Sequence, residues 1–213
     1  MGQQSVYEKI GKLKIIPVIT IEDPSKALAL ADALIEGGLP VAEITFRTPA
    51  AGEVMKIISR ERPDFLVGAG TILTVDNLKM AADCGASFGV APGLTEKIVQ
   101  AALDIHFPFS PGIMTPSELQ AAIDMNVRVL KFFHAEAAGG SVMLKNILAP
   151  FAHLGIRYIP TGGITTGKVK DYLEIPQVIA AGGSWIASKD DIANGSWEKV
   201  KKNCLEIRRL IAQ

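Results

Sequence analysis

The feature that most constrains the fold is a regular alternation of short apolar segments with amphipathic ones. About eight short segments rich in β-branched and aromatic residues are predicted to be strands. They cover residues 13–19, 41–46, 65–70, 88–91, 107–110, 128–133, 157–161 and 177–181. Helix-start signals stand between them, at Asp23-Pro24, Thr48-Pro49 and the capping-box pattern Thr115-Pro116-Ser117-Glu118. This alternation favours a closed (β/α)8 TIM barrel over an open parallel sheet.

A short amphipathic helix is predicted ahead of the first strand. Val6, Ile10 and Leu13 recur at helical spacing, so we expect a helix over residues 3–12 that plugs one end of the barrel. The length of 213 residues suits one α/β barrel, and no linker composition divides the chain. We therefore expect a single (β/α)8 barrel domain over residues 1–213.

Composition excludes several classes of partner. Lys+Arg and Asp+Glu both total 22, so no net field favours nucleic acid. Neither a signal segment at Met1–Ser5 nor an apolar stretch of membrane-spanning length is found, which predicts a soluble, cytoplasmic protein without membrane association. Cys84 and Cys204 stand far apart and the three histidines are dispersed, so neither a disulfide framework nor a metal or cofactor is predicted.

One lysine stands at the centre of the apolar segment 128–133. An ionised amine is costly to bury, and burial favours its neutral form. A neutral amine is a nucleophile that can form a Schiff base with a carbonyl. Lys131 is therefore a candidate catalytic residue. Taken alone, the segment also fits a lysine facing water on an edge strand, or one in a structural ion pair.

Side-chain alternation predicts which residues face the barrel interior. In the segment 41–46, Glu43 and Thr45 share one face with the following Arg47, while the apolar residues of the other face pack under the helices. The same alternation groups Lys131 with Val129 and Phe133, Thr71 with Val67 and Ala69, and Thr161 with Ile159. Polar side chains there must satisfy one another or a ligand, and barrel active sites lie at the carboxyl ends of the strands.

Two of these side chains suggest specific chemistry. Glu43 is a candidate general acid/base, because Schiff-base reactions require repeated proton transfers. The alternative is that it only pairs with Arg47 or Lys131. Arg47 offers a planar fork suited to a carboxylate or phosphate, although it also fits a surface arginine at a strand end.

A pair of glycines follows each of the last two predicted strands, at Gly162-Gly163 and at Gly182-Gly183. Paired glycines let backbone N–H groups approach an anion, and a following short helix would direct its positive end toward it. Barrel enzymes frequently bind phosphate with these two loops. One such pair can be only a tight turn, but two at matching positions predict a phosphate site.

Several motifs, read together, resemble one known family. They are Glu43-Ile44-Thr45-Phe46-Arg47, Gly68-Ala69-Gly70-Thr71, Ser110-Pro111-Gly112, Lys131-Phe132-Phe133, Pro160-Thr161-Gly162-Gly163 and Gly182-Gly183-Ser184. In this order, and over nearly the whole chain, they resemble the bacterial 2-keto-3-deoxy-6-phosphogluconate (KDPG) aldolase and 4-hydroxy-2-oxoglutarate (KHG) aldolase family. The resemblance implies a homotrimeric class I aldolase of the Entner–Doudoroff pathway, without a cofactor, that cleaves a phosphorylated 2-keto acid to pyruvate and glyceraldehyde 3-phosphate.

The resemblance also implies roles for individual residues. Lys131 would be the Schiff-base lysine and Glu43 the acid/base. The implied substrate-binding residues are Arg47 and Thr71 at the pyruvoyl carboxylate, Phe133 at the wall of the site, Pro92, and Thr161, Gly162, Gly163, Gly182, Gly183 and Ser184 at the distal and phosphate end. The chain departs from the family where His134 follows Phe133, since the family usually has proline there.

The sequence leaves alternatives open. The substrate could be the C4-epimeric galactonate compound or KHG, and motifs alone do not distinguish these. A phosphosugar isomerase or epimerase would share the glycine loops but would need no strand-centred lysine. A non-catalytic phosphosugar-binding barrel would have no reason to contain both Lys131 and Glu43.

Overall fold

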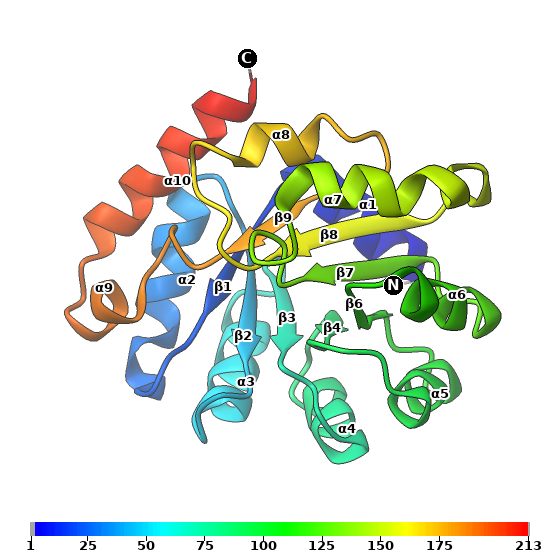
Figure 1. The fold of residues 1–213 in the computed structure, drawn as a ribbon. Helices are drawn as coiled ribbons and strands as arrows, with labels where there is room; N and C mark the ends of the chain where they lie inside the picture. Colours follow the sequence, from blue (N-terminus) through cyan, green and yellow to red (C-terminus); the bar gives the residue numbers. More distant parts are fainter. Residues whose placement is uncertain (1–2, 213) are drawn as a thin grey trace.

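The computed structural model describes residues 3–212 as a ring of parallel strands surrounded by helices (Figure 1). The strands are β1 (Ile15–Ile19), β2 (Val41–Thr45), β3 (Leu66–Gly70), β4 (Phe88–Val90), β5 (Phe109–Ser110), β6 (Gly112–Ile113), β7 (Val129–Phe133), β8 (Arg157–Thr161) and β9 (Ala181–Gly183). They form one sheet in the order β5-β4-β3-β2-β1-β9-β8-β7-β6. Every strand pairing in this sheet is parallel.

The two strands at the ends of this order, β5 and β6, are separated along the chain only by Pro111. β5 pairs with β4 and β6 pairs with β7, so together they fill the place of one strand and close the ring. Proline lacks an N–H and interrupts the ladder at this point. The predicted (β/α)8 barrel is confirmed. The fifth strand, predicted at 107–110, lies instead over residues 109–113 with a break.

Helices surround the ring, and the first of them lies across one of its ends (Figure 1). They are α1 (Gln3–Leu13), α2 (Ala27–Glu36), α3 (Ala51–Glu61), α4 (Val75–Asp83), α5 (Glu96–Asp104), α6 (Pro116–Asp124), α7 (Gly140–Leu148), α8 (Val169–Leu173), α9 (Lys189–Ala193) and α10 (Trp197–Ala212), with 3-10 turns η1 (Pro24–Lys26) and η2 (Ala149–Leu154). Across residues 3–212, none of the helices has both the length and the apolar character needed to cross a bilayer.

The predicted lead-in helix closes one end of the barrel. Val6 and Ile10 of α1 are buried and pack with inward side chains of the strands, among them Val41 and Ile159. The hydroxyl groups of Tyr7 and Ser110 form a 2.9 Å hydrogen bond. Apolar closure at the amino ends of the strands leaves their carboxyl ends as the place for a site.

Two of the three predicted helix starts are confirmed. Asp23 caps η1, which leads into α2, and Thr115 forms a capping box with Glu118 at α6. The start predicted at Thr48-Pro49 is wrong, because α3 begins at Ala51. The Thr48 hydroxyl instead donates to the carbonyl of Ile21 at 2.6 Å. The side chain that was predicted to cap a helix therefore makes a tertiary hydrogen bond.

The alternation predicted for the third strand is wrong. Val67 and Ala69 pack in the cluster between the sheet and the helices, whereas Leu66 packs in the barrel interior. Thr71, grouped with Val67 and Ala69, follows the end of the strand with a φ of +60°, so strand alternation does not reach it. Glycines occupy two inward positions of this strand, and a glycine gives no polarity signal from which a face can be assigned.

The last strand also begins later than predicted. Of the expected segment 177–181, the part before Ala181 has an isolated bridge between Val178 and Tyr158, and the regular strand β9 is Ala181–Gly183. The glycines that were predicted to follow the strand therefore lie within it. Gly182 pairs with Ile16 on one side and with Thr161 on the other.

Candidate active site

Lys131 and Glu43 meet inside the barrel. The Lys131 Nζ lies 3.0 Å from Glu43 Oε1 and 3.3 Å from Oε2, and the two residues are 4% and 3% exposed. Strand β7 is hydrogen-bonded on both sides, to β6 and β8, so the edge-strand interpretation of Lys131 is wrong. Each buried charge has the other as its partner, which removes much of the cost of burying it.

Gly70 makes room for this pair and Gly112 makes room for the loop after β4, although the sequence motifs predicted a role for neither. A Cβ on Gly70 would lie 2.2 Å from Glu43 Oε1, so the carboxylate occupies space that any other residue would fill. A Cβ on Gly112, which pairs with Lys131, would lie 2.2 Å from the carbonyl oxygen of Pro92. Glycine inside a strand often marks such a close approach, and that is the signal that could have found them.

Phe133 borders the lysine, and Pro92 lies beside Gly112, the residue that pairs with Lys131. The Phe133 ring centroid is 5.3 Å from Lys131 Nζ, within the range of a cation–π contact. Pro92 lies in the loop after β4, and Gly93 of that loop accepts a hydrogen bond from the N–H of Gly112. His134, the departure from the family pattern, is exposed and rests against Phe133 with ring centroids 3.4 Å apart.

Arg47 and Thr71 lie just beyond the carboxyl ends of the adjacent strands β2 and β3. Arg47 is exposed in the turn after Thr45, beyond the regular strand, so strand alternation does not reach it and its predicted inward direction stays a prediction. Thr71 is half-buried. Both residues lie at the end of the barrel where the Glu43 strand terminates, within the half of the ring that contains β1 to β3.

Thr161 is buried at the end of β8, where the register places it between Phe133 and Gly182. Within the described part of the chain its Oγ1 has no hydrogen-bond partner. A Cβ on Gly182 would approach this oxygen to 2.6 Å. A buried hydroxyl without a partner is costly, so this position is suited to a polar group supplied by a ligand.

The two glycine pairs have different structures. Gly162 and Gly163 form a loop with φ values of +108° and +76°, whereas Gly182 and Gly183 are buried in β9 and Ser184 is exposed after it. In the described chain neither glycine pair is followed directly by a helix, since α8 begins at Val169 and α9 at Lys189, and the contribution of a helix N-terminus stays a prediction. An anion at this end of the barrel can bind to the backbone N–H groups of the two glycine segments.

The geometry supports carbonyl chemistry at the Lys131 amine. A proton can pass between the amine and the Glu43 carboxylate across a single hydrogen bond, without a bridging water. Among residues 3–212, no group of three or more His, Cys, Asp or Glu side chains is arranged to hold a metal ion.

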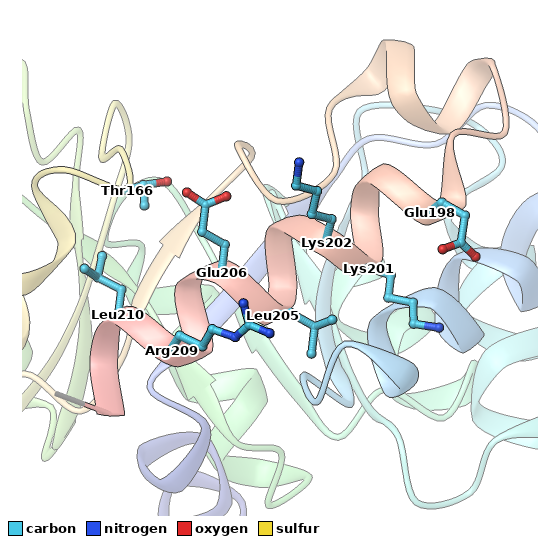
Figure 2. A pocket seen from close by; sticks show the side chains of 8 residues that line it. All are labelled: Thr166, Glu198, Lys201, Lys202, Leu205, Glu206, Arg209 and Leu210. Carbon is cyan, nitrogen blue, oxygen red and sulfur yellow. The ribbon is translucent and has the colours of Figure 1, made fainter.

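Two other hollows lie away from these residues. One, of about 550 Å³, follows the outer surface of α10, where Figure 2 shows charged side chains of both signs, including Lys202 and Glu206. The second, of about 690 Å³, lies at the α1 end of the barrel and includes Tyr7 and Arg128 in its lining. Neither is lined by Lys131 or Glu43.

Comparisons with known proteins show the family of the chain. The sequence profile of the family described as KDPG and KHG aldolase matches residues 6–203. The chain is 43% identical to the 2-dehydro-3-deoxy-phosphogluconate aldolase of Haemophilus influenzae, over 98% of this chain and 97% of that one. It is also similar to a solved KDPG aldolase of Legionella pneumophila, with pyruvate captured as a covalent carbinolamine (TM-score 0.91, 36% identity, 97% and 98% coverage). A Zymomonas mobilis KDPG aldolase solved with 3-phosphoglycerate gives a TM-score of 0.85 at 37% identity, with 94% of both chains covered.

Proposed function

The chain belongs to the KDPG and KHG aldolase family and is a carbon–carbon lyase, and from this we propose that it cleaves KDPG to pyruvate and glyceraldehyde 3-phosphate through a Schiff base on Lys131. The observation that carries the proposal is the buried Lys131–Glu43 pair at the centre of the barrel. The pyruvate carbinolamine of the Legionella relative supports the same chemistry. Family membership does not favour the isomerase or the non-catalytic alternative.

In the proposed mechanism the Lys131 amine attacks the C2 ketone to give a carbinolamine, which loses water to form an iminium ion. The C3–C4 bond then breaks and its electron pair moves into the iminium, giving an enamine. Glyceraldehyde 3-phosphate leaves once the C4 hydroxyl has lost its proton. Protonation of the enamine at C3 and hydrolysis release pyruvate and the free amine. The iminium supplies the polarisation that a metal would otherwise provide, so activity without a metal stays a prediction.

Glu43 is the proposed acid/base in each proton transfer. Its carboxyl group would donate a proton to the departing water, accept one from the C4 hydroxyl and return one to C3. The contact of 3.0 Å to Lys131 Nζ supports this assignment, because the reacting carbon atoms would be bound to that nitrogen or lie close to it. A purely structural ion pair would also have this geometry, so the role of Glu43 needs its own test.

The substrate-binding roles are proposals that rest on position and family resemblance. Arg47 and Thr71 would hold the carboxylate, beyond the ends of the two strands that carry Glu43 and its neighbour Gly70. The unpartnered Thr161 hydroxyl supports a polar contact to the substrate chain. The phosphate would bind to the loops at Gly162-Gly163 and Gly182 to Ser184. We also propose that the protein is cytoplasmic and that it forms a homotrimer. Light scattering can check the trimer.

Borohydride trapping with pyruvate tests the proposal directly. Reduction should fix pyruvate to the wild-type chain, with the added mass on the peptide that contains Lys131. Lys131→Ala should not be labelled, whereas the control Lys145→Ala, which removes an exposed lysine of α7, should be labelled as the wild type is. An adduct on another lysine, or none, would overturn the mechanism. Cleavage rates on KDPG, its C4 epimer and KHG then identify the preferred substrate.

A further inference from the structure

Glu136, three residues beyond the end of β7, links the loop after β7 to the loop after β8. Its Oε1 accepts a hydrogen bond from the hydroxyl of Tyr172 at 2.6 Å, and its Oε2 accepts one from Lys168 Nζ. Tyr172 is fully buried in α8, and Lys168 immediately precedes that helix. The carboxylate therefore joins α8, the loop that leads into it and its own loop.

The backbone strengthens the same connection. The N–H of Glu136 donates to the carbonyl of Gly162 at 3.0 Å, and the N–H of Ala135 donates to the carbonyl of Thr161 at 2.9 Å. Gly163 has a φ of +76°, and a Cβ on it would lie 2.9 Å from the Cβ of Glu136. Main-chain hydrogen bonds thus hold the glycine loop beside Glu136, and the carboxylate of Glu136 holds Lys168 and Tyr172 in the segment that follows this loop.

We propose that Glu136 is a positioning residue that fixes the Gly162-Gly163 loop for the phosphate end of the substrate. This inference rests on the proposed function, and it adds a residue that does not itself touch the substrate. An anion can bind to backbone N–H groups only when these converge, and a loop already held in place loses less conformational entropy on binding. Lys168 balances the charge of the carboxylate, so Glu136 stands near an anion site without an unpaired charge.

Glu136 is not a second acid/base in this arrangement. Both of its carboxylate oxygens are engaged, while the partner of Lys131 is Glu43. Partial burial alone would raise the pKa of Glu136, but the hydrogen bonds from Lys168 and Tyr172 outweigh it and hold the pKa below its usual range. The group is therefore ionised at neutral pH, as a fixed acceptor should be.

The test separates the phosphate end from the pyruvate end of the site. Steady-state kinetics of Glu136→Ala would be measured on KDPG and on unphosphorylated KHG, together with C3 proton exchange of pyruvate. We expect KM for KDPG to rise about tenfold, the effect of losing roughly one charge-assisted contact. The value of kcat, the KM for KHG and the pyruvate exchange rate should stay within about twofold of wild type.

Further variants make the result decisive. Glu136→Gln keeps an oxygen that can accept from Tyr172, so it should raise the KM for KDPG less than Glu136→Ala does. Lys168→Met removes the charged partner from an exposed position, and it tests the same expectation if Glu136→Ala does not fold. Glu36→Ala removes the acid of a Lys201–Glu36 pair on the outer helices and should change none of these quantities.

The inference is overturned if the KM for KDPG is unchanged in Glu136→Ala and Lys168→Met. It is equally overturned if KM rises by the same factor for KDPG and KHG, or if pyruvate exchange falls in parallel, because the effect would then lie in the imine half of the site. Wild-type protein that neither traps nor exchanges pyruvate would contradict the proposed function instead, so the two failures are distinguishable.

Discussion

Gly70 stands where a side chain would displace the carboxylate of Glu43. A Cβ built on Gly70 lies 2.2 Å from Glu43 Oε1 and 2.6 Å from its Cγ, although the two residues belong to different strands. β2 and β3 are paired with Glu43 opposite Gly68 and Thr45 opposite Gly70. The position of the proposed acid/base thus depends on the absence of one methyl group on the neighbouring strand.

The substitution Gly70→Ala should therefore lower activity by moving Glu43 away from Lys131. Because the carboxylate is the end of a side chain, it can shift and the barrel should still fold. We expect the rate of pyruvate C3 proton exchange to fall about tenfold or more, since general acid–base catalysis depends on hydrogen-bond reach. Gly11→Ala is the control, because its Cβ would meet only Ile179 at 3.9 Å. Wild-type exchange in Gly70→Ala would show that the carboxylate position is not critical.

Glu43→Gln should separate proton transfer from folding and binding. Glutamine keeps the size and the hydrogen-bonding capacity of the side chain but cannot donate and accept protons in turn. We expect pyruvate C3 exchange to slow by about 10²–10⁴-fold, the usual contribution of a general acid/base. The exchange reaction needs the imine and the base but no aldehyde. If Glu43→Gln exchanges at the wild-type rate, Glu43 is only a structural partner of Lys131.

Gly37→Ala should destabilise the contact between α2 and α10. A Cβ on Gly37 would lie 2.3 Å from the Cβ of Cys204, and that residue is fully buried. Neither backbone can yield easily, so we expect a loss of about 1–3 kcal/mol in the free energy of unfolding, as for other overpacked cores. Urea denaturation measures this change. Gly52→Ala, whose nearest neighbour would be Met80 at 3.4 Å, is the control, and equal stability of the two variants would contradict the prediction.

Asp191 should make stability depend on acid pH. Hydrogen bonds from Lys199 and then from Ser188 lower the pKa of this buried carboxyl below its usual value. A group with a lowered folded-state pKa stabilises the fold above its unfolded pKa of about 3.9, and this contribution is lost as pH falls through the folded-state value. Asp191→Asn should therefore be less stable than wild type at pH 7, by roughly 1–2 kcal/mol.

The difference in the free energy of unfolding between Asp191→Asn and wild type should shrink toward zero as the wild-type carboxyl is protonated in strong acid. Urea denaturation of both proteins from pH 7 downward measures it. Asp190→Asn is the control, because it changes the neighbouring exposed acid of the same helix. Its free energy of unfolding at neutral pH should differ much less from that of wild type. A difference between Asp191→Asn and wild type that does not vary with pH would contradict the assignment.

Much of the architecture could be predicted from local patterns. The alternation of apolar and amphipathic segments indicated the barrel, because strand and helix periodicities depend only on neighbouring residues. The plug at Val6 and Ile10 and the cap at Thr115 are confirmed for the same reason. Lys131 stood out because a charge inside an apolar run requires a partner, wherever that partner lies.

Only the tertiary structure decided how these parts meet. Glu43 and Lys131 are far apart in the sequence, and closure of the ring brings their side chains together. The inward face of β3 could not be assigned, since its interior positions at Gly68 and Gly70 carry no side chain and the spaces they leave are filled from β4 and β2. Arg47 lies in a turn beyond the regular strand, which ends at Thr45, so strand alternation could not place it. Register and packing between distant segments set these positions, and no local pattern encodes them.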